Sequence, residues 1–413
     1  MRIGIDCRMF SSGFTGIGRY TFELVRNLER LSIQDPENQH QYVLFFNKDK
    51  FSNYDNFKPT APNFEKVEVD APHYSLKEQT SFLKAINAQK LDLMHFTHFN
   101  APIRYKRPFI VTIHDLTHTL FPGRKMTSLP YRIAYKSVIK SAVKKAKKVI
   151  AVSENTKQDL IKIHHVPSNK IEVVYEGANE DYYQFSPDQE QAAAQNLRDK
   201  YNITAPFLLY TGVHRYHKNL PRLIEAFEII AADIPGHPGN SDDSWLPQAN
   251  LPVKNPEKPS PQSSLQPQPI TLVITGKKDP LYPEPEQEVA KRNLAPKVHF
   301  PGHVPEEDLI ALYNLAEAYV FPSLYEGFGL PVLEAMQCGT PVVASNVSSI
   351  PEVAGADNAL FFDPENPQDI AQKTTQLLQD PQLQAQLREK GLQRVKAFSW
   401  GKMAKEILAL YNS

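Results

Sequence analysis

Runs of apolar residues the length of a β-strand recur along the chain and alternate with stretches that have helical periodicity. Six such runs lie in the first half, at residues 3–6, 42–46, 91–96, 109–114, 149–153 and 171–175. Six more lie in the second half, at residues 207–211, 270–275, 298–300, 319–323, 342–345 and 360–362. Apolar strands that alternate with helices are typical of parallel sheets covered by helices. The pattern therefore predicts an α/β chain with a parallel sheet in each half, and a doubly wound arrangement in the first.

The length of the chain, 413 residues, predicts two domains, because a single hydrophobic core rarely grows to that size. The boundary is expected between residues 178 and 198, where an acidic and aromatic segment gives way to a glutamine-rich one. We place the first domain at 1–185 and the second at 186–397. Residues 235–269 hold nine of the 34 prolines and have almost no apolar periodicity. This composition predicts a disordered insertion in the second domain.

Composition narrows the class of protein. Apolar residues make up 41% of the chain and charged residues 22%, as in soluble globular proteins. Lysine plus arginine balance aspartate plus glutamate at 46 each, so no basic surface for nucleic acid is expected. Cys7 and Cys338 are too few for a disulfide framework, and no apolar run approaches the roughly 20 residues of a membrane-spanning helix. No secretory leader precedes the first strand, and we therefore expect a cytoplasmic protein.

The strongest candidate for a functional site is the stretch at residues 326–334, Glu-Gly-Phe-Gly-Leu-Pro-Val-Leu-Glu, which lies between two predicted strands. Gly327 and Gly329 allow backbone amides to come close to a ligand, and the proline suits the first turn of a helix. The free amides and positive dipole of that helix start favour a phosphate or a polyhydroxyl ligand. Glu326 and Glu334 flank the turn, and their carboxylates can bind hydroxyl groups. Because the turn follows a strand of a parallel sheet, we expect it at the carboxyl edge, where open α/β folds bind ligands.

Residues 326–345 resemble the signature of the family-four retaining glycosyltransferases, also described as glycosyl transferases group 1. Segments that resemble other parts of this family occur in the same chain order, at residues 16–20, 112–116, 152–157, 212 and 218–220. The resemblance covers nearly the whole chain. It implies the GT-B architecture, in which two Rossmann-like domains, each with a doubly wound parallel sheet, face each other across a cleft. It also implies that a C-terminal helix within residues 398–413 packs back on the first domain.

The resemblance implies roles for residues that match the family's motifs. Glu326 would contact hydroxyls of the transferred sugar, and Glu334 the nucleotide ribose. Lys218 would bind the donor phosphates, and His114 would contact the 6-hydroxyl of the donor sugar. The residues expected to bind the donor are Gly16, Gly18, Gly212, Lys218, Glu326, Gly327, Phe328, Gly329, Leu330 and Glu334. The residues expected to take part in catalysis are Glu326, His114, Lys218 and Arg215.

The chain departs from the family pattern after the glycine of the second domain, where many members carry arginine and this chain has Val213. Arg215, two residues further along, is the candidate to replace that arginine and to bind the diphosphate through two guanidinium nitrogens. Gly16 and Gly18 lie in a strand-to-helix region, but Thr21 stands where a dinucleotide fingerprint has its third glycine. An NAD-dependent enzyme is therefore not expected.

The resemblance implies a retaining hexosyltransferase that uses a nucleotide-diphosphate sugar, with GDP-mannose favoured. The expected route is a same-face substitution in which the departing phosphate oxygen takes the proton of the acceptor, although covalent routes remain open. Preorganised cations and amides stabilise the leaving group, so no cofactor and no metal are expected. His95, His98 and His118 form no helix-borne zinc motif and have no cysteine partner. Two other classes are compatible with the chain: another GT-B sugar enzyme, such as a phosphorylase or an epimerase, and an inactive sugar-nucleotide-binding module.

The acceptor is expected to be a glycan or a lipid-linked sugar bound by loops of the first domain, at residues 72–80 and 101–107. A lysine-rich segment at residues 136–148 permits two interpretations. It is either a solvated helix face or a basic face that rests on anionic membrane, as in peripheral glycosyltransferases with lipid-linked acceptors. The expected partners are thus a nucleotide sugar, an acceptor and, under the second interpretation, an anionic membrane surface, but no nucleic acid.

Overall fold

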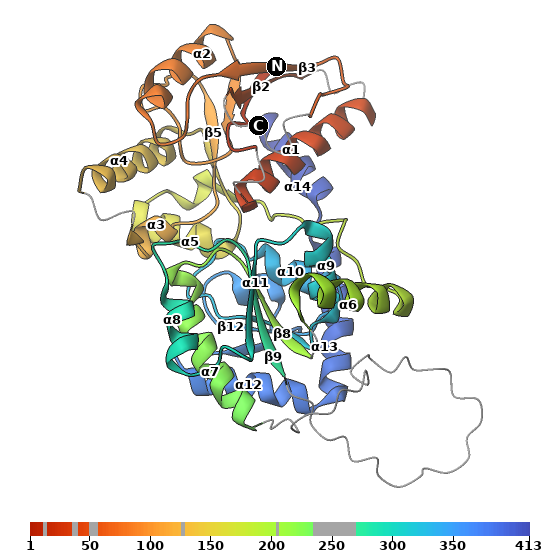
Figure 1. The fold of residues 1–413 in the computed structure, drawn as a ribbon. Coiled ribbons are helices and arrows are strands. Elements are labelled where there is room, and N and C mark those ends of the chain that lie inside the picture. The colour runs from red at the N-terminus through yellow and green to blue at the C-terminus, as the bar shows by residue number, and fades with distance from the viewer. Residues whose placement is uncertain (11–14, 35–39, 49–56, 125–128, 204–205, 234–269) are drawn as a thin grey trace. The chain divides into compact units, whose positions relative to one another are not determined.

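The computed structural model describes residues 1–10, 15–34, 40–48, 57–124, 129–203, 206–233 and 270–413. The insertion expected at residues 235–269 lies outside the described residues. The chain divides into two compact units, and many of their elements are labelled in Figure 1. The first consists of Met1–Asn179, Glu326–Leu330 and Phe398–Ser413, and the second of Glu180–Tyr325 and Pro331–Ala397.

Within the described residues, the first unit is built on a seven-stranded sheet in the order β3-β2-β1-β4-β5-β6-β7, and neighbouring strands are parallel. Its strands are β1 (Arg2–Asp6), β2 (Gln41–Asn47), β3 (Phe64–Val69), β4 (Leu93–Phe96), β5 (Phe109–Ile113), β6 (Lys148–Ala151) and β7 (Ile171–Val173). The chain adds β2 and β3 on one side of β1 and the later strands on the other, which is the doubly wound topology.

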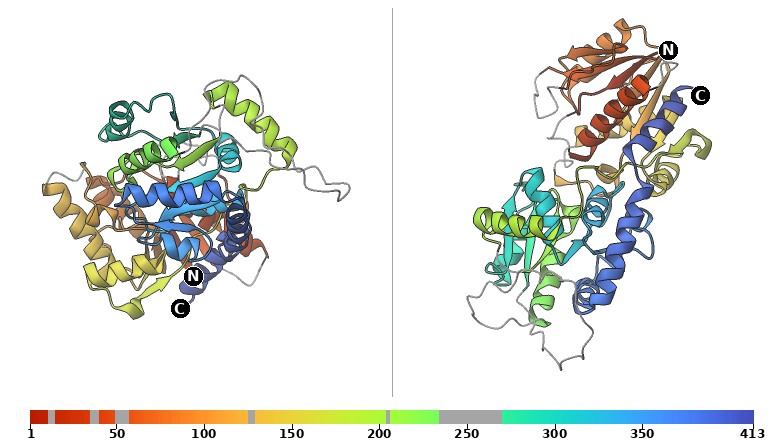
Figure 2. Two further views of the ribbon diagram at one scale, coloured as in Figure 1. Left: turned by 90° about the horizontal axis from the view of Figure 1, so that it is seen from below. Right: turned by 90° about the vertical axis from the view of Figure 1, so that its right-hand side faces the viewer.

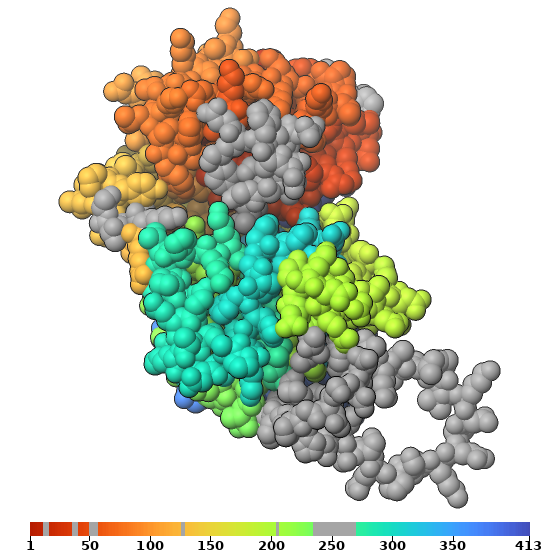
Figure 3. All heavy atoms as spheres, in the orientation of Figure 1, coloured from red at the N-terminus to blue at the C-terminus, as the bar shows by residue number. Residues whose placement is uncertain are grey.

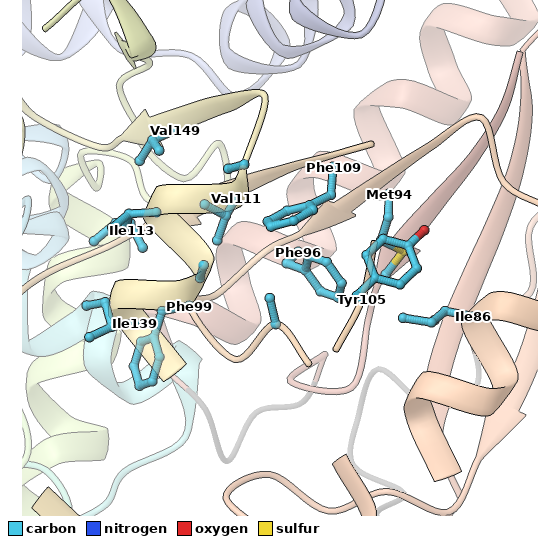
Figure 4. Packing of buried hydrophobic residues seen from close by; sticks show 14 of the residues in the cluster. Ile86, Met94, Phe96, Phe99, Tyr105, Phe109, Val111, Ile113, Ile139 and Val149 are labelled. Carbon is cyan, nitrogen blue, oxygen red and sulfur yellow. The ribbon is translucent and has the colours of Figure 1, made fainter. Parts of the chain in front are cut away.

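Helices cover both faces of this sheet. They are α1 (Thr15–Gln34), η2 (Glu78–Phe82), α2 (Leu83–Ala88), α3 (Thr117–Leu120), α4 (Leu129–Lys145), α5 (Glu154–His164), η4 (Ser168–Lys170) and α14 (Trp400–Tyr411). Tyr42 and Leu44 of β2 belong to the core that includes α1 and α14. Val43 and Phe45, which alternate with them, belong to the core that includes α2 and α4, part of which is shown in Figure 4. The period of two along the strand thus sends side chains into a separate core on each face.

The C-terminal helix α14 belongs to the first unit and lies beside α1 (Figure 2). Ser399 caps its N-terminus by accepting a hydrogen bond of 3.4 Å from the backbone N–H of Lys402. Gly177 has no room for a side chain, since a Cβ atom there would lie 2.2 Å from the backbone nitrogen of Trp400. Glycine at this position therefore allows the C-terminal segment to pack closely on the rest of the unit.

The described part of the second unit is built on a six-stranded parallel sheet in the order β10-β9-β8-β11-β12-β13. Its strands are β8 (Phe207–Thr211), β9 (Thr271–Thr275), β10 (Val298–Gly302), β11 (Ala318–Phe321), β12 (Val342–Ser345) and β13 (Leu360–Phe362). Its helices are α6 (Pro187–Tyr201), η5 (Tyr216–Lys218), α7 (Leu220–Asp233), α8 (Glu284–Lys291), α9 (Glu306–Leu315), α10 (Leu330–Gln337), α11 (Ile350–Ala354), α12 (Pro367–Gln379), α13 (Pro381–Arg394) and η6 (Val395–Ala397). The chain again starts in the middle, at β8, and winds outward in both directions.

The predicted fold class is confirmed, because the chain is α/β with a doubly wound parallel sheet in each half. Strand β3 has no counterpart among the predicted strands. It lies at the edge of the first sheet, where Phe64 and Val69 are buried but Glu65 and Glu68 are exposed. An edge strand with a solvated face lacks the continuous apolar run by which the buried strands are recognised.

Candidate functional site

Polar and charged side chains gather at the carboxyl edge of the first sheet, where its parallel strands end. Asp6 ends β1, and the guanidinium of the buried Arg8 binds both of its carboxylate oxygens, at 2.9 and 2.8 Å. Thr97 follows β4, His114 follows β5, and Glu176 lies in the loop after β7. In open α/β sheets this is the edge at which ligands bind.

His114, which the resemblance assigns to the donor sugar, has protein partners at both ring nitrogens. Nε2 lies 2.9 Å from the carbonyl oxygen of Thr97, and Nδ1 lies 3.0 Å from Oε1 of Glu176. A carbonyl oxygen only accepts, so in the hydrogen bond to Thr97 the Nε2 atom is the donor. The ring is buried, and Tyr20 of α1 packs edge-on against it with 4.7 Å between ring centres. The contact of His114 with a sugar stays a prediction, and it would require one of these partners to be exchanged.

The segment Glu326–Leu330 is held in the first unit by the carbonyl of its first glycine. Ser153 Oγ donates to the carbonyl oxygen of Gly327 at 2.6 Å, and Thr156 Oγ1 donates to the same atom at 3.2 Å. A Cβ atom on Gly327 would lie 1.8 Å from the carbonyl oxygen of His114. The segment thus passes directly against the end of β5, and no side chain fits at that position. These contacts fix the backbone position of Glu326.

The rest of the segment is held by packing and by backbone conformation. Phe328 packs against Tyr175 and Phe398, with ring centres 6.1 and 5.7 Å away. Gly329 has φ +115°, a conformation that favours glycine, and a Cβ atom there would meet no described residue within 4 Å. Leu330 packs against the core of the first unit. Close packing therefore requires glycine at position 327, whereas the backbone conformation requires glycine at position 329.

Glu334 lies in α10 and accepts a hydrogen bond from a buried tyrosine. The hydroxyl of Tyr313, in α9, is 3.0 Å from Oε2 of Glu334 and 2.8 Å from Oγ1 of Thr211, the last residue of β8. Burial, together with the charge of Glu334, raises the pKa of the Tyr313 hydroxyl well above its usual range, so the hydroxyl remains a donor. The tyrosine thus fixes the carboxylate at the carboxyl end of β8. No feature of the sequence singles out Tyr313, because its hydroxyl meets the glutamate only through the packing of two helices.

The residues expected to bind the diphosphate lie on the loop that follows β8. Gly212 opens this loop with φ +144°, a conformation that favours glycine. The Nε atom of Arg215 lies 3.8 Å from Oδ2 of Asp279, and the arginine side chain is 43% exposed. Lys218 ends the short helix η5, with its ammonium 5.6 Å from the ring centre of Phe321. Both cations therefore lie at the carboxyl edge of the second sheet, on one loop.

Asn219 anchors this loop to the loops that follow two other strands of the sheet. Its side-chain amide donates to the carbonyl oxygen of Pro322 at 3.1 Å and to that of Pro364 at 2.7 Å, which lie in the loops after β11 and β13. The residue has φ +60°, a left-handed conformation that asparagine tolerates. Because Lys218 directly precedes it, these two hydrogen bonds set the point at which the lysine side chain leaves the backbone.

Gly16 and Gly18 lie in the first turn of α1, which begins at Thr15. Among the described residues, no atom lies within 4 Å of the place where a Cβ atom on Gly16 would be. Backbone amides in the first turn of a helix have no partner within the helix, and the helix dipole favours an anion there. The same helix carries Tyr20, whose ring contacts His114, so the glycine turn and the histidine are structurally linked.

Two of the three histidines considered as metal ligands are buried and hydrogen-bonded inside the fold. His95 is buried between the hydroxyls of Tyr411 and Thr112, at 2.7 and 2.9 Å, and His98 is hydrogen-bonded to Asn100. Across the ranges that the structure describes, no group of three or more histidine, cysteine, aspartate or glutamate side chains is placed to hold a metal ion.

The predicted site residues thus fall into two groups, each at or next to the carboxyl edge of one sheet. The group in the first unit is Gly16, Gly18, His114, Glu326, Gly327, Phe328, Gly329 and Leu330. The group in the second unit is Gly212, Arg215, Lys218 and Glu334. Residues that position them, and that the sequence did not single out, are Thr97, Glu176 and Tyr313. Ser153, which also positions the segment, lies in the family-like stretch at residues 152–157.

Models of two protein families match the chain. Residues 14–182 match the model described as Glycosyltransferase Family 4, and residues 258–394 match the model described as Glycosyl transferases group 1. Together the matched residues make up most of the chain.

Similar proteins are found among characterised sequences and among solved structures. The O-antigen chain mannosyltransferase B of Escherichia coli is 27% identical over 410 residues, which cover 96% of each chain. The serotype-specific mannosyltransferase WbdA of Escherichia coli is 28% identical over 295 residues, which cover 71% of this chain and 32% of WbdA. Sucrose-phosphate synthase from Thermosynechococcus elongatus has a TM-score of 0.73 at 22% identity, over 100% of this chain and 98% of that one. The Anabaena protein HepE, solved in complex with UDP and glucose, has a TM-score of 0.71 at 17% identity, over 100% and 99%. At these identities the structural likeness shows a shared fold.

Proposed function

This chain belongs to the family-four glycosyltransferases of the GT-B fold, and on this premise we propose that it transfers mannose from GDP-mannose to a glycan or lipid-linked acceptor with retention of configuration. Its relatives include enzymes named mannosyltransferases, one of which aligns with 96% of this chain. The short segment at residues 112–116 also favours GDP-mannose. HepE, in contrast, was solved with UDP and glucose, so a UDP sugar is the competing donor.

The observation that carries the proposal is the arrangement of charges at the carboxyl edge of the second sheet. Glu334 is held there by Tyr313, and Arg215 and Lys218 extend from one loop. A fixed carboxylate suits the ribose hydroxyls of a nucleotide, and an arginine with a lysine suits its diphosphate. The nucleotide part of the donor therefore binds at this edge.

In the proposed reaction the bond between the sugar C1 and the diphosphate oxygen breaks, and its electron pair goes to the diphosphate. Lys218 and Arg215 stabilise the charge that develops there, as preorganised cations do in other transfer reactions. Glu326 and His114 orient the sugar through its hydroxyls. The acceptor oxygen bonds to C1 on the face that the diphosphate leaves, and the acceptor proton passes to the departing phosphate oxygen. Configuration at C1 is retained, and no carboxylate of the enzyme bonds to the sugar.

The proposed reaction needs no cofactor and no metal, because the positive charge at the diphosphate comes from the protein. Chelation with EDTA should then leave the transfer rate unchanged. A rate that falls with EDTA and recovers with Mg²⁺ or Mn²⁺ would contradict this part of the proposal.

We place the reaction in the cytoplasm, with helix α4 as the contact between the enzyme and anionic membrane. The described residues include no helix that is long and apolar enough to cross a membrane. Helix α4 exposes Lys136, Lys140, Lys144 and Lys145, and basic helix faces are attracted to anionic lipid. Sedimentation with phosphatidylglycerol vesicles and with phosphatidylcholine vesicles tests the contact. Equal binding to the two kinds of vesicle would show that α4 has a solvated basic face that makes no specific contact with anionic lipid.

A donor panel tests the proposed function. The chain is incubated with GDP-mannose, UDP-glucose and ADP-glucose, with and without α-mannobiose as acceptor, and products are analysed by NMR. We expect GDP-mannose to be consumed fastest and the product to be an α-linked mannoside, because the donor is an α-anomer. A β-linked product would contradict retention, and preference for a UDP sugar would contradict the donor. Release of sugar phosphate or isomerisation of the donor would instead indicate a phosphorylase or an epimerase.

A further inference from the structure

A half-exposed tyrosine stands on the first unit, in the loop between β3 and η2. Tyr74 is 46% exposed and has φ +59°, a backbone conformation that is uncommon for residues other than glycine. Such strain persists where the surrounding structure fixes it, and it is concentrated at binding and catalytic sites. The segment at residues 60–90, orange in Figure 3, forms part of the surface of this unit. The backbone N–H of Ile103 donates to Oε1 of Gln79 at 2.8 Å, which joins the two loops expected to bind the acceptor.

Further aromatic rings surround Tyr74. The ring centres of Phe99 and Tyr131 each lie 6.1 Å from that of Tyr74. Phe99 contacts Tyr135 edge-on at 5.1 Å, and Figure 4 shows it next to Ile139 of α4. The rings come from the loop after β3, the loop after β4 and helix α4, so several elements fix the surroundings of Tyr74. Because Phe99 and Tyr135 are buried and Tyr131 is partly buried, Tyr74 is the most exposed ring of this group.

The loop that carries Asp115 packs against the same group of rings. Oγ1 of Thr119 lies 3.0 Å from the hydroxyl of Tyr135, and the ring centre of His118 lies 5.7 Å from that of Tyr135. Burial, the neighbouring Tyr131 and the carboxylates of Asp115 and Glu78 all raise the pKa of the Tyr74 hydroxyl above its usual range. Glu78 is buried and is engaged by the guanidinium of Arg8 at 3.3 Å. Asp115 is only partly buried, so of these two carboxylates it is the more accessible to a ligand.

Asp115 connects this aromatic group to the rest of the candidate site. It follows His114 at the end of β5, and its Oδ1 accepts a hydrogen bond of 2.8 Å from the backbone N–H of Thr117. A Cβ atom on Gly327 would lie 2.9 Å from the Cβ atom of Asp115, so the aspartate touches the segment that begins with Glu326. A ligand bound at Asp115 therefore lies beside the segment that the proposed function assigns to the transferred sugar.

We propose that Tyr74, Tyr131 and Asp115 form the subsite for a terminal pyranose of the acceptor, an inference that rests on the proposed function. An aromatic ring offers a flat apolar surface on which the C–H face of a pyranose packs. An ionised carboxylate accepts hydrogen bonds from adjacent sugar hydroxyls. A lipid chain would use the ring but would gain nothing from the carboxylate, so the combination favours a sugar.

The test removes the ring without adding backbone strain. Tyr74→Asn is suitable because asparagine tolerates positive φ, and Tyr74→Phe keeps the ring. Tyr183→Asn is the matched control, since Tyr183 is 48% exposed and lies in the second unit. Methyl α-mannopyranoside and α-mannobiose are titrated into the full chain by saturation-transfer NMR, and GDP binding is measured by calorimetry.

We expect Tyr74→Asn to weaken binding of both mannosides about tenfold or more, the usual effect of losing an aromatic anchor from a binding surface. Tyr74→Phe should retain most of the binding, and Asp115→Asn should weaken it. GDP affinity should stay at the wild-type value in the Tyr74 variants, and Tyr183→Asn should resemble wild type in both assays.

The outcomes separate this subsite from the proposed function. Wild-type affinity for the mannosides in Tyr74→Asn, or failure of the wild-type chain to bind either mannoside, would overturn the subsite. A second outcome is that mannoside binding depends on Tyr74 although the wild-type chain binds neither GDP nor GDP-mannose. This outcome would support the subsite and would overturn GDP-mannose as the proposed donor.

Discussion

Removing the hydroxyl of Tyr313 tests whether the second unit holds the nucleotide as proposed. In Tyr313→Phe the ring remains, and the carboxylate of Glu334 loses the hydrogen bond that it accepts at 3.0 Å. Oγ1 of Thr211 loses a partner at 2.8 Å but keeps the hydroxyl of Tyr319 at 3.1 Å. The direct effects of the substitution are therefore on the orientation of Glu334 and on one buried hydroxyl pair.

The size of the effect follows from the kind of bond that is lost. A hydrogen bond to a charged group contributes about 1.5–3 kcal/mol, which corresponds to a change of about 10- to 150-fold in an equilibrium constant. If Glu334 must be oriented to bind ribose, this free energy appears as weaker binding of the nucleotide. We expect the Kd for GDP and the KM for GDP-mannose to rise about tenfold or more. The kcat should change less, because the ribose is bound alike in the ground state and the transition state.

Tyr319→Phe is the matched control. Tyr319 is equally buried, and its hydroxyl also bonds to Thr211, at 3.1 Å to Oγ1 and 3.5 Å to the carbonyl oxygen. Both variants should lower the free energy of unfolding by about 1 kcal/mol or more, because each loses a buried hydrogen bond to Thr211 and Tyr313→Phe also loses the bond to Glu334. Urea unfolding measures this loss, and calorimetry measures GDP affinity, which should fall in Tyr313→Phe alone. Wild-type GDP affinity in a destabilised Tyr313→Phe would refute the reasoning, since the tyrosine would then support the fold without orienting a ligand-binding carboxylate.

Further predictions concern pH, the glycine segment and the cations. Burial lowers the pKa of His95 from 6.5 to about 3. In the unfolded chain His95 takes up a proton below about pH 6.5, whereas in the folded chain it stays neutral down to about pH 3. As the pH falls from about 6.5 to about 3, His95 should therefore lower the free energy of unfolding by about 1.4 kcal/mol per pH unit. Urea unfolding at pH 7.5 and pH 5.5 should show a smaller loss in His95→Gln than in wild type, and an equal loss would contradict the assignment. Gly327→Ala should lower the Tm more than Gly329→Ala and should abolish transfer. The reason is that the added Cβ atom would meet backbone at position 327, whereas at position 329 it would meet no described residue within 4 Å. Equal Tm values for the two variants would disprove this ranking. Lys218→Ala and Arg215→Ala should each weaken GDP binding about tenfold or more, as expected for charge-assisted phosphate contacts. Wild-type GDP affinity in Arg215→Ala would show that Arg215 does not replace the arginine that many family members carry at the position of Val213.

Strands of this fold can be predicted where burial on both faces leaves a continuous apolar run. The runs Phe207–Thr211 in β8 and Val342–Ser345 in β12 are of this kind, and every residue in them is buried. Strand β3 escapes detection because Glu65 and Glu68 on its exposed positions interrupt the run. The edge strands β7, β10 and β13 are also predicted, because an apolar run remains in each of them. An edge position alone therefore does not hide a strand, and β3 needs its three-dimensional partner β2 to be recognised because charged residues break its run.

The candidate site can be predicted only as far as its residues form local patterns. The glutamates, glycines and cations of the motifs lie in loops after strands, so their places at the sheet edges follow from the sequence. Their partners do not, since His114 is bonded to residues 17 positions before it and 62 positions after it. Tyr313 likewise lies 21 positions before Glu334. Such pairs have no fixed period or spacing, because the packing of whole strands and helices sets them.

Glycine at position 327 has two explanations, one from the sequence and one from the structure. The sequence predicts a close approach of backbone amides to a bound molecule. In the structure a Cβ atom there would meet the carbonyl oxygen of His114 at 1.8 Å, so packing within the first unit is sufficient to require glycine. Glu326 therefore takes its backbone position from the first sheet, whereas Glu334 takes its side-chain orientation from Tyr313 beside the second. Because the two carboxylates of one short motif are fixed by different sheets, a substitution at Gly327 should disturb Glu326 and leave the binding of GDP through Glu334 intact.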